Sequence, residues 1–198
     1  MTKPKIVGLG GTPRAGSSTE MALRACLAIA ESDGAETVLI TGQEMVLPIY
    51  MPELPDRSAE AKRMIEHIRT CDGLIIASPG YHGSISGLIK NAIDYIEDLR
   101  GDSRSYLEGR AVGCIMGAAG GQALGTALTT LRSVVHALRG WPTPFGATLN
   151  TSGKLFDAEG RCIDEAARQQ IELVARQVMH FARMQLAAGR AEPGLKSG

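Results

Sequence analysis

Strand-length apolar runs alternate with helix-length amphipathic stretches along most of the chain, and this alternation limits the fold more than any other feature. Five strands are predicted at about residues 4–10, 36–41, 73–78, 110–116 and 144–149. Five helices are predicted at about residues 18–32, 59–71, 84–99, 122–138 and 164–187. Strands that are apolar at nearly every position are typical of a parallel sheet covered on both faces. We therefore expect an α/β fold with a doubly wound sheet.

The same pattern indicates one domain. The connections are short, with the exception of residues 42–58, and no linker or internal repeat interrupts them. We assign residues 1–188 to this domain. The remaining residues, 189–198, contain Gly, Pro and Ser without an apolar period, so we expect a loose C-terminal tail.

Charge and composition argue against several classes of function. The 21 basic residues balance the 21 acidic ones, and no basic run is present, so neither nucleic acid nor an anionic membrane is an expected partner. The four cysteines lie far apart without a CxxC pair, which offers neither a metal site nor a disulfide framework. Because the chain lacks both an apolar leader and a stretch of about 20 apolar residues, we expect a soluble, cytoplasmic protein.

The loop after the first strand has the composition of an anion site. Its glycines permit a tight turn, the helix that follows exposes its first amides, and Arg14 adds a planar cation. Hydroxyl groups come from Thr12, Ser17, Ser18 and Thr19. Pro13 stands where a dinucleotide GxGxxG motif needs glycine, and Ser17 stands where a nucleotide P-loop needs lysine. The loop therefore suits a single phosphate monoester, although a plain Gly/Ser turn with a helix cap is the alternative.

Two further loops follow the third and fourth strands. In open α/β sheets, ligands bind beyond the carboxyl ends of the strands, where these loops meet. Residues 78–87 combine a proline, an aromatic residue and several glycines, a composition that suits the edge of a flat ring. Residues 117–122 have almost no side chains and would leave room for such a ring.

These motifs resemble those of the NADPH-dependent FMN reductases. Residues 11–19 (GTPRAGSST) resemble the phosphate loop G-S-x-R-x-x-S, and residues 79–94 (PGYHGSISGLIKNAID) resemble the signature P-x-Y-x-x-S-x-x-G-x-L-K-N-x-x-D. Residues 47–50 (LPIY) are similar to the family's L-P-L-Y element. The resemblance covers about residues 4–150. Thr12 replaces a serine and Ile89 a leucine, and neither change affects the expected chemistry.

The resemblance implies a flavodoxin-like sheet of five parallel strands in the order 2-1-3-4-5, with FMN bound and NADPH or NADH as co-substrate. The implied cofactor-binding residues are Thr12, Arg14, Ser17, Ser18, Thr19, Pro79, Gly80, Tyr81, His82, Gly83, Ser84, Gly117 and Gly120. No side chain is assigned a catalytic or metal-binding role, because the flavin itself accepts the hydride. His82 is expected to make a polar contact, with a catalytic proton transfer as the alternative.

The acceptor and the assembly are left open by the residues. The leading hypothesis is an NAD(P)H-dependent FMN reductase that passes electrons to free flavin, which a flavin-dependent monooxygenase could then use. The alternatives are a reductase of quinones, azo compounds or metal oxyanions, and a non-enzymatic electron carrier. Lys90 and Asp94 are spaced i, i+4 in the order that is weaker within a helix. The family resemblance implies that this pair lies at a subunit contact, so a homodimer or homotetramer is expected.

Overall fold

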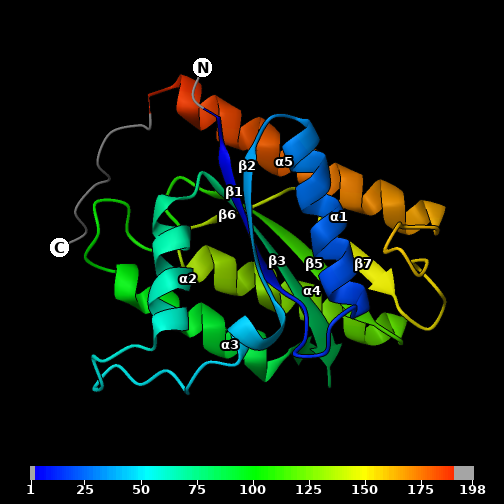
Figure 1. The fold of residues 1–198 in the computed structure, drawn as a ribbon, viewed down its shortest axis with the longest axis horizontal. Helices are drawn as coiled ribbons and strands as arrows, with labels where there is room; N and C mark the ends of the chain where they lie inside the picture. Colours follow the sequence, from blue (N-terminus) through cyan, green and yellow to red (C-terminus); the bar gives the residue numbers. More distant parts are fainter. Residues whose placement is uncertain (1–2, 190–198) are drawn as a thin grey trace.

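The computed structural model describes residues 3–189, which form a parallel sheet between two layers of helices (Figure 1). The strands are β1 (Lys5–Gly10), β2 (Glu36–Ile40), β3 (Gly73–Tyr81), β4 (Ser84–Ile85), β5 (Ala111–Ala118), β6 (Trp141–Pro142) and β7 (Ala147–Asn150). The α-helices are α1 (Ser18–Ser32), α2 (Ala59–Thr70), α3 (Gly87–Asp94), α4 (Gly121–Ala137) and α5 (Glu165–Ala187). Two 3-10 helices, η1 (Gly42–Met45) and η2 (Tyr95–Leu99), complete the described elements.

The strand order is β2-β1-β3-β5-β6, and all of these strands run parallel. Strand β7 also pairs with β5, beyond β6 along the same edge. The order 2-1-3-4-5 expected from the sequence is confirmed when β6 and β7 are taken together as the fifth strand. The topological switch point therefore lies between β1 and β3, the place where such sheets bind ligands.

The fifth strand was predicted as one segment, residues 144–149, and this prediction is wrong in its bounds. Pro144 has no amide hydrogen to donate, and the amide of Phe145 donates to Gln177 Oε1 instead of to β5 (2.9 Å). The ladder is therefore interrupted between Pro142 and Ala147.

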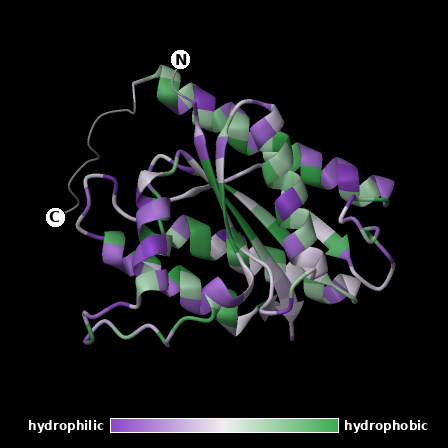
Figure 2. Ribbon diagram, viewed as in Figure 1, coloured by the Kyte–Doolittle hydropathy of each residue, from purple (hydrophilic) through white to green (hydrophobic). Residues whose placement is uncertain are grey.

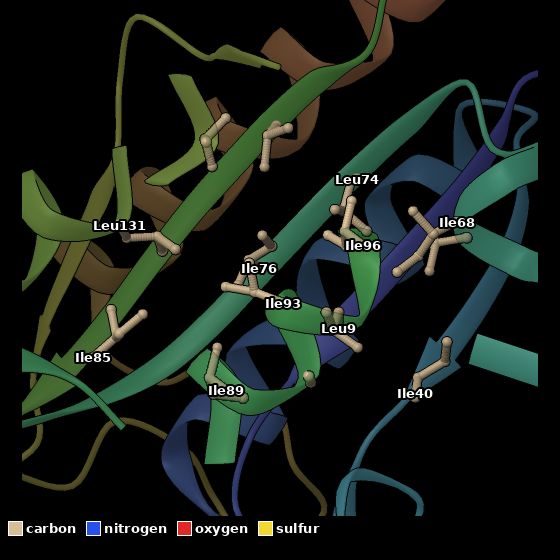
Figure 3. Packing of buried hydrophobic residues seen from close by; sticks show 14 of the residues in the cluster. Leu9, Ile40, Ile68, Leu74, Ile76, Ile85, Ile89, Ile93, Ile96 and Leu131 are labelled. Atoms are coloured by element: carbon tan, nitrogen blue, oxygen red, sulfur yellow. The ribbon is translucent and has the colours of Figure 1, made fainter. Parts of the chain in front are cut away.

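Each face of the sheet has its own hydrophobic core. Helices α1 and α5 pack against each other over one face, and α2, α3 and α4 cover the other (Figure 1). The hydropathy colouring separates these roles, because the central strands are hydrophobic while the helices alternate between hydrophobic and hydrophilic residues (Figure 2). In the second core, Ile89, Ile93 and Ile96 lie near Leu74 and Ile76 of β3 (Figure 3).

The third helix was predicted over residues 84–99, and the structure corrects both its start and its end. Ser84 and Ile85 form β4, which pairs antiparallel with the end of β3. The helix begins at Gly87 because the Ser86 hydroxyl caps it, accepting a hydrogen bond from the amide of Ile89 (3.2 Å). From Tyr95 the chain continues as the 3-10 helix η2. The C-terminal tail predicted at 189–198 lies outside the described residues except for Gly189.

Candidate functional site

A cavity of about 380 Å³ lies at the carboxyl ends of β1, β3 and β5. Three loops that are far apart in the sequence line it together. Its lining residues are Thr12, Arg14, Ser17, Ser18, Thr19, Pro79, Gly80, Tyr81, Gly117, Ala118, Ala119 and Thr151. The cavity thus brings the predicted phosphate loop together with the ends of the third and fourth predicted strands.

The phosphate loop (residues 10–19) depends on glycine where it leaves β1. Gly10 and Gly11 have φ angles of 152° and 92°, which side chains rarely adopt. A Cβ on Gly10 would also lie 2.0 Å from the carbonyl oxygen of Ala77 on the neighbouring strand. The chain can therefore leave β1 closely against β3 and enter α1 beside the cavity.

The first turn of α1 presents polar groups to the cavity. Ser17 is the N-cap, and its hydroxyl oxygen accepts a hydrogen bond from the amide of Glu20 (3.3 Å). The Ser17 and Thr19 hydroxyl groups lie 3.4 Å apart and are almost fully buried. Because the first amides of a helix have no partner within it, this turn combines free N–H donors, hydroxyl groups and the positive end of the helix dipole.

The remaining predicted groups of the loop are more accessible. Arg14 is exposed and lines the cavity, which leaves its guanidinium free to move toward an anion. The Thr12 hydroxyl donates to the carbonyl oxygen of Arg14 (3.1 Å), so it closes the turn within the loop.

The second loop is a hairpin that joins β3 to β4. His82 and Gly83 form its two-residue turn, and both have positive φ angles (51° and 79°), as tight hairpins of this type require. Ser78 anchors the hairpin, because its hydroxyl accepts from the amide of Ser86 (3.0 Å) and donates to the carbonyl oxygen of Pro79 (2.9 Å). Pro79, Gly80 and Tyr81 consequently lie along the cavity.

The end of β5 forms the opposite wall. A Cβ on Gly117 would lie 2.7 Å from Cγ2 of Thr19, so a larger residue would collide with the first turn of α1. Thr151 was missed by the sequence analysis. It follows β7, and its amide donates to the carbonyl oxygen of Ala118 (2.9 Å), which holds it beside β5. Its place directly after the fifth strand is the signal that could have identified it.

The cavity does not include every residue expected there. His82, Gly83, Ser84 and Gly120 are not among its lining residues, although each adjoins a segment that is. His82 and Gly83 form the hairpin turn, and Gly120 is the N-cap of α4. Their contacts with a cofactor remain predictions.

The long connection after β2 is tied to the third helical segment. The Asn91 side chain accepts from the amide of Tyr50 (2.9 Å) and donates to the carbonyl oxygen of Pro48 (2.9 Å). Arg57 makes two hydrogen bonds to Asp98 (2.8 and 2.9 Å), and its guanidinium lies 4.6 Å from the Tyr50 ring centroid. The bond from Arg57 holds the pKa of Asp98 below its usual value. We call this set the loop clamp (Tyr50, Arg57, Asn91 and Asp98).

A second cavity, of about 340 Å³, lies beside the loop clamp, between the third helical segment and α4. Its lining is Tyr50, Lys90, Ile93, Asp94, Glu97, Val134, Ala137 and Leu138. Lys90 Nζ lies 2.6 Å from Asp94 Oδ1, so the two side chains form an ion pair within the helix. The subunit contact expected for them remains a prediction.

Within residues 3–189, no group of three or more His, Cys, Asp or Glu side chains is placed to hold a metal ion. Cys26 and Cys114 are buried free thiols, and burial raises the pKa of Cys114 to about 12. Of the helices described, none is both long and apolar enough to cross a bilayer.

Comparison with known proteins agrees with this geometry. The family model for NADPH-dependent FMN reductases matches residues 4–152. An NAD(P)H-dependent FMN reductase of Pseudomonas aeruginosa is 30% identical over 174 residues, which cover 85% of this chain and 89% of that protein. An FMN-dependent NADPH-azoreductase of Staphylococcus haemolyticus is 30% identical over 132 residues, 66% of each chain, so the match spans just under two thirds of that relative.

The fold is also found in solved structures. FerB, a flavoenzyme NAD(P)H:(acceptor) oxidoreductase from Paracoccus denitrificans, superimposes with a TM-score of 0.72 at 21% identity, covering 91% of this chain and 98% of that one. The flavodoxin-like fold implied by the sequence resemblance is thereby confirmed. The chain belongs to the NADPH-dependent FMN reductase family, whose members are flavin oxidoreductases that use FMN as cofactor and NAD(P)H as co-substrate.

Proposed function

We propose that the cavity at the carboxyl ends of the strands holds FMN, and that the chain uses it to pass electrons from NAD(P)H to a small acceptor. One observation carries the proposal. The phosphate loop, the end of β3 and the end of β5 lie far apart in the sequence, and together they line a single cavity of about 380 Å³.

The two kinds of lining residue fit the two ends of FMN. Arg14, the hydroxyl groups and the first amides of α1 suit a phosphate monoester. Gly80, Gly117 and Ala118 have no side chain or a single methyl group, which leaves room where a flat ring would lie. Position 117 has no room for a side chain, because a Cβ there would collide with Thr19.

In this proposal the chain's own residues bind and orient the flavin, and they do not transfer protons. When bound, FMN supplies the hydride acceptor. The ionisable side chains that line the cavity are Arg14 and Tyr81, and neither is an ordinary general base at neutral pH. The ring of Tyr81 lines the cavity while its residue is 54% exposed, so it can contact a second planar molecule such as nicotinamide or an acceptor.

Free flavin is our leading acceptor, and the reduced flavin released would then be a substrate for a flavin-dependent monooxygenase. An azo compound or quinone is the second candidate, favoured by the name of the staphylococcal relative. Steady-state oxidation of NADPH and NADH with free FMN, a quinone or an azo dye distinguishes them. The acceptor with the highest kcat/KM identifies the class, and oxidation of neither cofactor with any of the three would refute the enzymatic proposal.

We further propose that two copies associate through the face that carries the second cavity, giving a homodimer or a dimer of dimers. The cavity is lined by Ile93, Val134 and Leu138 beside the exposed Lys90–Asp94 pair. Val46, Ile49, Met51 and Leu54 of the neighbouring loop are exposed as well, although single exposed apolar residues are common. Light scattering should give at least twice the mass of the chain, and Val134→Glu should reduce it to that of a monomer.

Binding of the cofactor has its own test. Because the phosphate loop addresses a phosphate, the protein should bind FMN far more tightly than riboflavin in a fluorescence titration. Equal affinity for the two flavins would contradict the assignment of the loop.

A further inference from the structure

A buried carboxylate lies directly behind the phosphate loop, where the proposed function does not use it. Glu20 is only 4% exposed and occupies the third position of α1. One of its oxygens, Oε2, accepts a hydrogen bond from the amide of Gly16 (3.0 Å). Its Cβ lies behind the loop, because a Cβ on Gly11 would approach it to 3.2 Å. The loop that would hold a dianionic phosphate is thus supported by a negative charge.

The charge of Glu20 is only partly compensated. Its other oxygen, Oε1, accepts from both Nε (2.9 Å) and Nη2 (2.8 Å) of Arg24, one turn further along α1. The Arg24 side chain is 57% exposed, whereas that of Glu20 is 6% exposed. Water therefore screens the cation far more than the carboxylate, and the electrostatic field of the carboxylate persists in the loop.

Two consequences oppose anion binding. The Gly16 amide, which adjoins the cavity-lining Ser17, donates to Glu20 and is not free to meet a phosphate. The carboxylate also repels a dianion and counteracts the positive end of the α1 dipole. One consequence favours binding, since the same hydrogen bond holds the loop in shape before the ligand arrives.

We propose that Glu20 is a positioning residue that limits the affinity for the FMN phosphate, so that FMN exchanges with solution instead of being permanently retained. The inference rests on the proposed function, because it concerns the flavin phosphate in the same cavity. It assigns the two effects to different parts of one side chain. The oxygen that bonds to Gly16 shapes the loop, and the charge weakens its hold on FMN.

Glu20→Gln separates the two parts, because glutamine removes the charge and keeps one oxygen that can accept from Gly16. Its amide nitrogen then faces Arg24, whose exposed side chain can turn to solvent. We expect this variant to bind FMN about three- to tenfold more tightly and to release it more slowly, the scale of one partly screened charge. The gain should shrink in high salt, and riboflavin affinity should not change. Glu31→Gln removes one charge from the exposed far end of the same helix and should leave both affinities unchanged.

FMN affinity in Glu20→Gln equal to or below that of the wild type would overturn the proposal. If this variant does not fold, Arg24→Gln tests the same charge from an exposed position. It should weaken FMN binding severalfold without affecting riboflavin, and unchanged FMN binding would again overturn the inference. Failure of the proposed function is distinct, because the wild type would then fail to prefer FMN over riboflavin.

Discussion

Buried polar groups have different partners at the two ends of the parallel strands. We call the end where the strands begin the amino edge and the end where they finish the carboxyl edge. At the amino edge, Arg110 is 1% exposed, and its guanidinium donates to the carbonyl oxygens of Arg69, Cys71 and Tyr106. Asp72 nearby accepts from the amide of Lys5 (2.9 Å). At this end of the strands, the polar groups of the protein therefore satisfy one another's hydrogen bonds.

At the carboxyl edge, by contrast, the polar groups line a cavity. The first turn of α1 presents amides and hydroxyl groups, and the small residues at the end of β5 keep the space beside them open. The difference shows where each kind of polar group acts. Groups satisfied within the protein contribute to stability, and groups left for a ligand contribute to binding. Variants at the two edges should therefore change different measured quantities.

The largest expected effect is on stability at the amino edge. Arg110→Ala removes the guanidinium donor from the carbonyl oxygens of Arg69 and Tyr106, leaves that of Cys71 with Arg104, and creates a cavity. The free energy of unfolding should therefore fall by about 3–5 kcal/mol. Urea unfolding followed by circular dichroism measures it. The matched control is Arg176→Ala, whose exposed pair with Glu172 should contribute less than about 1 kcal/mol. Equal losses in the two variants would contradict the role of burial.

The second effect is on the space at the carboxyl edge. Gly117→Ala places a Cβ against Thr19 and should lower FMN affinity by about tenfold or more, with a loss of about 1–3 kcal/mol in unfolding free energy. Fluorescence titration and urea unfolding measure these changes. Gly125→Ala is the control, because this exposed glycine lies outside the cavity lining and a Cβ there meets nothing within 4 Å. A similar FMN defect in both variants would assign the effect to flexibility and not to space.

A third variant affects binding alone. Arg14→Ala should weaken FMN binding by about 1.5–3 kcal/mol, the scale of a hydrogen bond to a charged group. Since Arg14 is exposed, the unfolding free energy of the flavin-free protein should stay unchanged. Riboflavin titration is the matched measurement, and a parallel loss of riboflavin affinity would show that Arg14 does not address the phosphate.

The smallest effect concerns the loop clamp, which ties the connection after β2 to the third helical segment. Arg57 lowers the pKa of Asp98 in the folded state, so the stabilisation is present above the unfolded pKa near 3.8 and is lost as the pH falls through the lower folded value. We expect a few tenths of a kcal/mol at pH 7, because the pair is partly exposed. Asp98→Asn should remove this acid dependence, measured by urea unfolding at pH 7 and pH 3. An unchanged dependence would assign it to other carboxylates.

The sequence was most informative where function depends on neighbouring residues in the chain. The sequence predicted that the loop over residues 10–19 lies at the ligand cavity, because its glycines, hydroxyl groups and helix start lie within ten consecutive residues. That this loop binds a phosphate stays a prediction. For Gly117, by contrast, the sequence indicated only a small residue in a loop that would leave room for a flat ring. The reason that it must be small is its contact with Thr19, nearly a hundred positions earlier.

The alternation of apolar runs was sufficient to predict the fold class and the helices that follow the strands along the chain, because hydrophobic periodicity is a local property. Tertiary packing decided the rest. It interrupted the fifth strand at Pro144, placed Thr151 beside β5, and buried Arg110 among carbonyl oxygens that come from two separate segments, residues 69–71 and 106–108. It also placed Glu20 behind the loop. Such contacts depend on how the two helical layers and the sheet fit together, which no single stretch of sequence specifies.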